Sequence, residues 1–146
     1  MMIVQNSKIS KIVVSAIIKF NDEILLLRRN KDFEEINYGK GLWDLPGGKV
    51  EFGIQLNESL RKEMIEEIGF DLLNGKLVHA SSYILEYETI VVNQINMFYT
   101  FQMLNYHEIC LSLEHDKFCF FSKNKLFDLN MIPEVQNYLI HNFKNL

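Results

Sequence analysis

The sequence predicts an α+β fold in which helices pack on a mixed β-sheet, and three observations support this prediction. Runs of β-branched and aromatic residues, which are typical of strands, dominate the order of the chain. Between these runs, residues 56–68 carry apolar side chains at every fourth position, the spacing of a helix. Near the C-terminus, residues 132–143 place Pro133 in the first turn of a second helix. With 146 residues, this order favours a single domain over residues 1–146, in an α+β or three-layer arrangement.

The first third of the chain predicts a hairpin, a loop and a short extended piece. Residues 11–20 (KIVVSAIIKF) are rich in β-branched side chains, and the turn NDE leads from them into residues 24–29 (ILLLRR). Residues 30–41 (NKDFEEINYGKG) are mostly polar and contain two glycines, so they are predicted to form a loop. The segment LWDLPGG then leads into residues 49–52 (KVEF), which we expect to be extended.

The central helix is the element that the sequence defines most clearly. Its apolar positions recur every four residues: Leu56, Leu60, Met64 and Ile68. On a helix these side chains fan over roughly 120° of the surface, the width of a face that packs on a core. Gly69 follows directly and is the expected left-handed residue that ends the helix.

The second half of the chain predicts three strands and the closing helix. Residues 76–88 (KLVHASSYILEYE) and 89–103 (TIVVNQINMFYTFQM) are expected to pair through a turn near Thr89. Residues 117–122 (KFCFFS) predict a short buried strand, and residues 132–143 (IPEVQNYLIHNF) predict the closing helix.

Composition and charge argue against several classes of protein. The net charge is −4 without a dense basic cluster, whereas nonspecific binding to a polynucleotide needs a concentrated basic surface. No apolar run approaches the roughly 20 residues that cross a bilayer, and the N-terminal segment lacks the features of a secretory signal. We therefore expect a cytoplasmic protein that binds neither a nucleic-acid polymer nor a membrane. Cys110 and Cys119 form no CxxC motif, and we expect both to be buried free thiols.

Three glutamates share one side of the central helix. Glu63, Glu66 and Glu67 occupy an arc of about 100°, and Glu67 borders the apolar face, whereas Glu58 and Lys62 fall nearer the solvent side. A soluble acidic face is one explanation, since glutamate is a good exposed helix former. Glu63 and Glu67, however, are a like-charge i,i+4 pair near the helix C-terminus, where negative charge is least favourable. Both costs disappear if a hard divalent cation such as Mg²⁺ binds there.

The glycines before the helix supply a second signal. Gly47 and Gly48 follow Pro46, and consecutive glycines let the backbone approach a ligand closely. A PGG segment alone is usually just a turn. An acidic helix at a fixed distance after it makes a ligand site the better interpretation.

The segment from Gly48 to Phe70 resembles the box of the Nudix hydrolases, a family that cleaves nucleoside diphosphates linked to another moiety. The family pattern is G-x5-E-x7-R-E-U-x-E-E-x-G-U, where U is a bulky apolar residue. With Gly48 as the first glycine, the chain matches the pattern at Glu63, Met64, Glu66, Glu67, Gly69 and Phe70. It departs at Ile54, where the pattern has glutamate, and at Lys62, where it has arginine. The resemblance implies an α/β/α sandwich with a mixed sheet, a central catalytic helix and a C-terminal helix.

The same resemblance implies a metal site and a mechanism. Glu66 and Glu67 are expected as the main ligands of Mg²⁺, or of Mn²⁺, with Glu63 as a further ligand or as the base. The backbone carbonyl of Gly47 is expected to complete part of the shell. The ions are expected to neutralise the diphosphate and to align a water for in-line attack at phosphorus. Glu114, before the last strand, is the candidate for a further carboxylate from a late loop, and a solvated loop glutamate is the alternative.

Predicted substrate contacts come from the first glycine of the box and from residues that precede the box. Gly48, Trp43 and Arg29 are the predicted substrate-binding residues, and Trp43 is equally well explained as a core residue. Phe33 and Tyr38 are further aromatic residues that could stack on a base in this loop. Lys62, predicted as part of the catalytic machinery, keeps the positive charge of the family's arginine without its bidentate fork.

Marks of single family branches leave the substrate open. Tyr83 and Tyr87 match a tyrosine of the diadenosine polyphosphate enzymes, but aromatic strand residues are more often packing. Asn137 is available for the asparagine of the enzymes that remove oxidised guanine nucleotides. Glu51 and His115 are expected to be an exposed glutamate and an ordinary loop histidine.

The sequence thus predicts a Mg²⁺-dependent pyrophosphohydrolase that cleaves a nucleoside diphosphate linked to another moiety, or a nucleoside triphosphate. Its expected partner is a small nucleotide, and a homodimer is possible. The alternative is a nucleotide-binding or partner-binding module with weakened catalysis. Ile54 and Lys62 are the observations that support this alternative.

Overall fold

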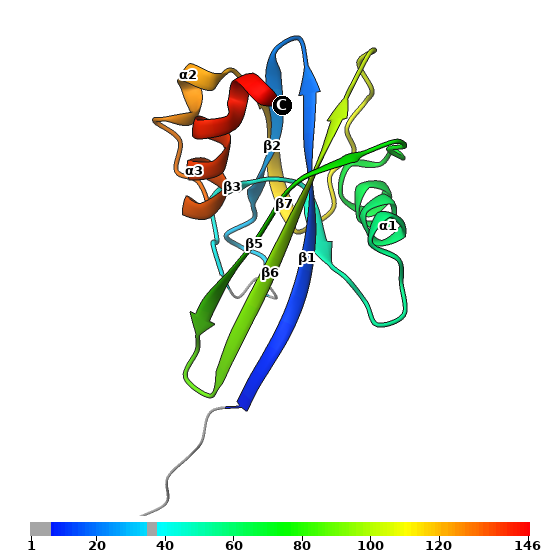
Figure 1. The fold of residues 1–146 in the computed structure, drawn as a ribbon. Helices are drawn as coiled ribbons and strands as arrows, with labels where there is room; N and C mark the ends of the chain where they lie inside the picture. Colours follow the sequence, from blue (N-terminus) through cyan, green and yellow to red (C-terminus); the bar gives the residue numbers. More distant parts are fainter. Residues whose placement is uncertain (1–6, 35–37) are drawn as a thin grey trace, which may run out of the picture.

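The computed structural model describes residues 7–34 and 38–146, which build one seven-stranded sheet with helices on both of its faces (Figure 1). The elements in chain order are β1 (Ser7–Phe20), β2 (Glu23–Arg29), β3 (Trp43–Asp44), β4 (Gly47–Lys49), α1 (Leu56–Ile68), β5 (Lys76–Glu86), β6 (Ile90–Gln102), β7 (His115–Phe121), α2 (Lys123–Leu126), α3 (Pro133–Asn142) and a 3₁₀ turn (Phe143–Asn145).

The sheet is mixed and centred on β1. The strand order is β3-β2-β1-β6-β5, while β4 pairs with β1 and β7 pairs with β2. β1 and β6 run parallel from the Ser7–Ile90 pair to the Lys19–Gln102 pair, and the other strand pairs are antiparallel. Figure 1 shows β1, β5 and β6 continuing as a long twisted ribbon beyond the helices.

Strands β1 and β2 are buried on both faces of the sheet at residues 14–18 and 24–27. This burial explains the almost continuous apolar runs of the two strands. One face of the sheet packs against α1 in a cluster that includes Val14, Ala16, Ile18, Leu60, Met64 and Ile68. The other face packs against α2 and α3 in a cluster that includes Ile17, Ile24, Leu26, Leu126, Val135 and Leu139. The predicted α/β/α arrangement with a mixed sheet is confirmed.

The central helix has the predicted bounds and the predicted end. α1 spans Leu56–Ile68, and Gly69 follows it with φ of 83° in the left-handed region. The Gly69 amide donates a hydrogen bond to the Met64 carbonyl at 3.1 Å, which closes the helix.

Both predicted hairpins are present. β1 and β2 pair through Lys19 opposite Ile24, around the predicted NDE turn. β5 and β6 meet at a turn in which the Tyr87 amide donates to the Ile90 carbonyl at 2.9 Å. α3 begins at Pro133, as predicted, and ends one residue earlier than the predicted range.

Several details differ from the prediction, and four of them bear on the site or on exposure. The extended piece after the glycines is β4, Gly47–Lys49, rather than residues 49–52, because the glycines themselves pair with β1. The last strand is exposed at its residues 116–119 instead of buried, since β7 pairs with β2 alone among the described strands. Cys119 lies in this exposed part of β7, and Cys110 lies in the loop before it. Both are exposed free cysteines, not buried ones. The four-residue α2 was not predicted, because one turn gives no periodic signal.

Positions 35–37 of the predicted loop lie outside the described residues. Within the described part of the chain, no helix is long and apolar enough to cross a membrane.

The packing of α1 gives a first prediction. Met64 is fully buried between α1 and the sheet, whereas its neighbour Ile65 is 54% exposed. Met64→Ala should therefore lower the free energy of unfolding by about 2–5 kcal/mol, as measured by urea denaturation. Ile65→Ala is the matched control and should cost less than about 1 kcal/mol. Equal losses in the two variants would show that α1 does not pack as described.

Candidate active site

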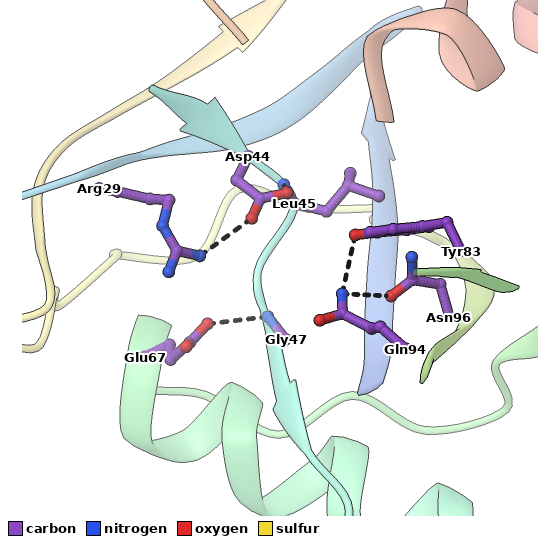
Figure 2. A network of polar contacts seen from close by, with 8 residues as sticks. All are labelled: Arg29, Asp44, Leu45, Gly47, Glu67, Tyr83, Gln94 and Asn96. Atoms are coloured by element: carbon purple, nitrogen blue, oxygen red, sulfur yellow. Dashed lines mark hydrogen bonds and ion pairs between the residues drawn. The ribbon is translucent and has the colours of Figure 1, made fainter. Parts of the chain in front are cut away.

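A cavity of about 220 Å³ lies where the glycine loop, α1 and the β1–β6–β5 ribbon meet. Side chains from all seven strands line it, together with Glu67 of α1 and two residues at the start of α3. Figure 2 shows polar side chains on both sides of the glycine loop at this point.

The peptide groups of Gly47 point toward α1. Gly47 lies opposite Ser15 of β1, and at the next pair along, the Ala16 amide donates to the Pro46 carbonyl at 2.9 Å. Because hydrogen-bonded and non-hydrogen-bonded pairs alternate in antiparallel strands, the amide and carbonyl of Gly47 both point away from β1. The Gly47 amide accordingly donates to Glu67 Oε2 at 2.8 Å (Figure 2).

Both glycines are required by close contacts. A Cβ atom at Gly47 would overlap the Val14 carbonyl oxygen of β1. A Cβ atom at Gly48 would overlap the carboxylate of Glu63, with Oε2 at 2.5 Å. Glycine at these two positions therefore lets the loop lie between β1 and α1 and leaves room for the Glu63 carboxylate.

Glu67 is a buried carboxylate, with 4% of its surface exposed. Burial raises the pKa of Glu67 well above its usual value, the hydrogen bond from Gly47 lowers it, and the charges of Glu63 and Glu114 raise it further. The ionised form of Glu67 is thus disfavoured unless a positive charge compensates for it.

Glu63 and Glu114 belong to the same acidic cluster, which we define as Glu63, Glu66, Glu67 and Glu114. Burial, followed by the charges of Glu66 and Glu114, raises the pKa of Glu63 to about 7. Glu114 also lines the cavity, so the fold brings it from a distant loop to the carboxylates of α1.

The wall formed by β2 and β3 holds an ion pair. Arg29 Nη1 lies 3.2 Å from Asp44 Oδ2, and the Leu45 amide donates to Asp44 Oδ1 at 2.8 Å (Figure 2). Burial raises the pKa of Asp44 to about 6, although Arg29 and the Leu45 amide both favour its ionised form. Asp44 orients the Arg29 guanidinium at the cavity wall.

These residues fit a hard divalent cation such as Mg²⁺. Carboxylate and carbonyl oxygens are its preferred ligands, and the Gly47 carbonyl with Glu63, Glu66 and Glu67 could supply them. Within residues 7–34 and 38–146, no three acidic, histidine or cysteine side chains converge into a ready-made metal cage. Mg²⁺ does not need one, because it usually keeps several waters and uses one or two carboxylates plus substrate phosphates. The raised pKa values of Glu63 and Glu67 reflect burial and like charges, which a bound cation offsets.

The structure brings some of the predicted residues to the cavity and separates others. The predicted residues that line the cavity are Arg29, Gly47, Gly48, Glu67 and Glu114. Glu66 and Lys62 instead share a shallow depression on the outer side of α1. Trp43 packs edge-on against Phe121 with ring centroids 4.9 Å apart, which favours the alternative that it is a core residue.

The positions that depart from the Nudix pattern are both at the surface. Ile54 is 41% exposed, and Lys62 Nζ lies 3.3 Å from Glu51 Oε1, in a pair whose side chains are more than half exposed. Glu51 therefore gives Lys62 an acidic partner three positions before the one that the pattern provides. Such an exposed pair adds little stability, but it joins the loop to α1.

Sequence reasoning missed several cavity residues. Lys11, Asp44, Gln94 and Asn96 line the cavity and were not predicted as site residues. The sequence feature that could have indicated them is a polar side chain at alternate positions of an otherwise apolar strand. Only the register between the strands, however, shows that these side chains face the same cavity. Among the residues left open, the cavity lining includes Tyr38, Tyr83 and Tyr87, and it does not include Phe33 or Asn137. The expectation that His115 is an ordinary loop histidine is wrong: it pairs with Arg29 as the first residue of β7, is 8% exposed and lines the cavity.

Comparison with known proteins identifies the family of the chain. A family model for the NUDIX domain matches residues 10–143. The chain belongs to the NUDIX domain family. The match includes the glycine loop, α1 and the whole cavity wall from β2 to β7.

Two curated proteins and one solved structure illustrate the NUDIX relationship. The 8-oxo-dGTP diphosphatase of Buchnera aphidicola subsp. Schizaphis graminum (strain Sg) is 34% identical over 76 residues, 52% of this chain and 55% of that protein. The chain thus spans about half the length of that relative. The CTP pyrophosphohydrolase of Escherichia coli (strain K12) is 26% identical over 121 residues, 83% of this chain and 82% of that protein. A MutT protein from Methanosarcina mazei Go1 has a crystal structure that matches with a TM-score of 0.76 and 27% identity, covering 97% of both chains.

The burial of Glu67 in this NUDIX site predicts a stability effect that depends on pH. The folded-state pKa of Glu67 lies above its unfolded value, so the folded protein binds more protons, and stability is lost as pH rises through this range. Glutamine stays neutral at every pH and keeps an oxygen that can accept the Gly47 amide. With a metal chelator present, Glu67→Gln should raise the free energy of unfolding at pH 8 by about 1 kcal/mol or more. At pH 4 the gain should vanish.

Urea denaturation at the two pH values measures this effect. Glu58→Gln, at an exposed position of the same helix, is the control and should change stability by less than about 0.5 kcal/mol at either pH. A Glu67→Gln variant that is less stable than the wild type at pH 8 would contradict the assignment of Glu67 as a strained carboxylate.

Proposed function

We propose that this NUDIX chain is a Mg²⁺-dependent pyrophosphohydrolase. Its substrate is a nucleoside triphosphate or a nucleoside diphosphate linked to another moiety, cleaved by attack of water at phosphorus. The observation that carries the proposal is the contact of Gly47 and Gly48 with the carboxylates of Glu67 and Glu63 at the edge of the cavity. The names of two relatives, a CTP pyrophosphohydrolase and an 8-oxo-dGTP diphosphatase, support the same class of reaction.

The acidic cluster provides the metal ligands in this proposal. Glu66, Glu67 and the Gly47 carbonyl hold the ion, and Glu63 acts as a further ligand or as the base that takes a proton from the attacking water. When bound, Mg²⁺ neutralises phosphate charge and lowers the pKa of a coordinated water. Glu114 adds a carboxylate from the opposite side of the cluster, in agreement with its influence on both Glu63 and Glu67.

Cations on the cavity wall provide the complementary charge for the substrate. Arg29 is fixed by Asp44, and Lys49 follows the glycines directly in β4. Both side chains line the cavity next to the glycine loop. Charge-assisted hydrogen bonds from such groups to phosphate oxygens are stronger than neutral ones, so these residues orient the phosphates above the acidic cluster.

A nucleotide-binding module with weakened catalysis is the second candidate. Ile54 and Lys62 support it, because the family's glutamate–arginine pair is absent from the chain. The contact of Lys62 with Glu51 speaks for the enzyme, since the loop and α1 remain joined by an ion pair. Calorimetric binding of nucleotides without hydrolysis, with both Mg²⁺ and Mn²⁺ and at several pH values, would favour the module instead.

Loss of single carboxylates tests the enzyme directly. Glu66→Gln and Glu67→Gln should each lower kcat for nucleotide hydrolysis by about 100-fold or more, because each removes charge that stabilises the transition state. Released phosphate and pyrophosphate, assayed separately, measure both rate and cleavage position. Circular dichroism should show an intact fold, and Glu58→Gln should keep wild-type rates. Near-wild-type kcat in both variants would refute the mechanism.

The support of α1 gives a separate prediction. If the exposed Lys62–Glu51 pair holds the loop less firmly than the family's pair, Ile54→Glu combined with Lys62→Arg should raise kcat more than either single change. Steady-state kinetics of the two single variants and the double variant measure this coupling. If the two changes affect kcat additively, or lower it, the Lys62–Glu51 pair already supports α1 as well as the family's pair would.

A further inference from the structure

One row of side chains on the cavity floor has no part in the proposed metal site. Lys11 of β1 lies opposite Gln94 of β6, and Tyr83 of β5 lies opposite the same Gln94. Directly paired residues point to the same face of a sheet, and all three side chains line the cavity. We call Lys11, Gln94, Tyr83 and the neighbouring Asn96 the polar row.

Hydrogen bonds within the polar row leave specific groups free for a ligand. Gln94 Nε2 donates to the Tyr83 hydroxyl oxygen at 2.8 Å and to Asn96 Oδ1 at 3.0 Å (Figure 2). Among the described residues, the Tyr83 hydroxyl hydrogen has no acceptor, and the Asn96 amide group, which also donates to the Tyr83 oxygen, keeps a second N–H without one. These two groups are therefore donors available to the cavity, and Gln94 Oε1 is an available acceptor.

Lys11 adds a cation to the row. It is half-buried, and among residues 7–34 and 38–146 no carboxylate lies within ion-pair distance of it. Burial, then the charge of Lys49, then that of Arg29, lowers the pKa of Lys11. A lysine offers three donors and no acceptor, so donors outnumber acceptors along the row.

The size and position of the cavity indicate which part of a substrate it holds. Its volume of about 220 Å³ is below the roughly 300–1,000 Å³ of pockets that enclose a whole drug-sized ligand. Glu67 and Glu114 of the acidic cluster line the cavity, whereas the carboxylates of Glu63 and Glu66 lie outside its lining. Figure 2 shows Glu67 on one side of the glycine loop and Gln94, Tyr83 and Asn96 on the other. A nucleotide with its phosphates at the acidic cluster therefore places its base on the side of the cavity that the polar row lines.

We propose that the polar row selects the base of the nucleotide, and that it favours bases with an exocyclic carbonyl oxygen over adenine. This inference rests on the proposed function. Guanine, cytosine, uracil and thymine present carbonyl oxygens that accept hydrogen bonds from Lys11, Tyr83 or Asn96. Adenine carries an amino donor where guanine carries O6, so at that position it would leave a donor of the polar row unpaired and face the Lys11 cation with an N–H group. A site built to hydrogen-bond one group discriminates strongly against an analogue that lacks it.

A panel of GTP, CTP, UTP and ATP tests the inference. The wild-type protein should show a kcat/KM for ATP at least about tenfold below the best carbonyl-bearing nucleotide. Lys11→Met and Tyr83→Phe should each raise KM for the carbonyl-bearing nucleotides about fivefold or more with kcat nearly unchanged, and should affect ATP less. The base preference should shrink in both variants. Tyr83→Phe keeps the aromatic ring, so it also separates a lost hydroxyl from lost packing.

Two control variants change the same residue types outside the cavity. Lys8→Met lies on β1 and Tyr99→Phe on β6, and neither residue lines the cavity. Both should keep the wild-type preference. A kcat/KM for ATP equal to that of the other nucleotides, or an unchanged base preference in Lys11→Met and Tyr83→Phe, would overturn the inference. Hydrolysis of the nucleotides would still support the proposed function in that case.

Absence of any hydrolysis would instead count against the proposed function. In that case the dissociation constants of the four nucleotides, measured by calorimetry with Ca²⁺ present, still test the polar row. A Kd for ATP as low as that of the other nucleotides would overturn it.

Discussion

The hydrogen bond from the Gly47 amide to the Glu67 carboxylate connects β4 to α1, and the geometry of the candidate site depends on it. It requires glycine at positions 47 and 48, since a Cβ atom at either would overlap β1 or Glu63. It also requires a carboxylate to be buried where the charges of Glu63 and Glu114 oppose it. The chain thus accepts a local electrostatic cost at neutral pH, which either protonation of Glu67 or a positively charged ligand offsets, and such costs are typical of functional sites.

The strand β1 serves the core and the cavity at the same time. Val14, Ala16 and Ile18 point to the face covered by α1, while the alternate positions Lys11 and Ser15 point into the cavity. Because the side-chain period of a strand is two, a shift of register by one residue would exchange the two sets. The apolar packing of α1 therefore also fixes where the polar residues of the cavity lie.

Much of the fold could be predicted from the sequence because its signals are local. The four-residue spacing in Leu56–Ile68 and the left-handed Gly69 define α1 without any knowledge of its neighbours. The spacing of Glu63, Glu66 and Glu67 likewise predicts that these side chains share one side of α1. Exposure was harder to predict: residues 118–121 of β7 are apolar in sequence, yet β7 pairs with β2 alone among the described strands and stays largely exposed. The polar row could not be predicted, because Lys11 and Gln94 become neighbours only through a parallel pairing of distant strands.

That parallel pairing has a consequence for how the chain reaches its native state. Every residue of β1 from Ser7 to Lys19 is paired with a residue of β6 that lies 83 positions further along the chain. The two hairpins can close from nearby residues alone, whereas joining them must wait until a long intervening loop has been closed. During synthesis on the ribosome, the centre of the sheet therefore stays incomplete until β6 has emerged. The cavity, which needs both strands, is among the last parts of the molecule to form.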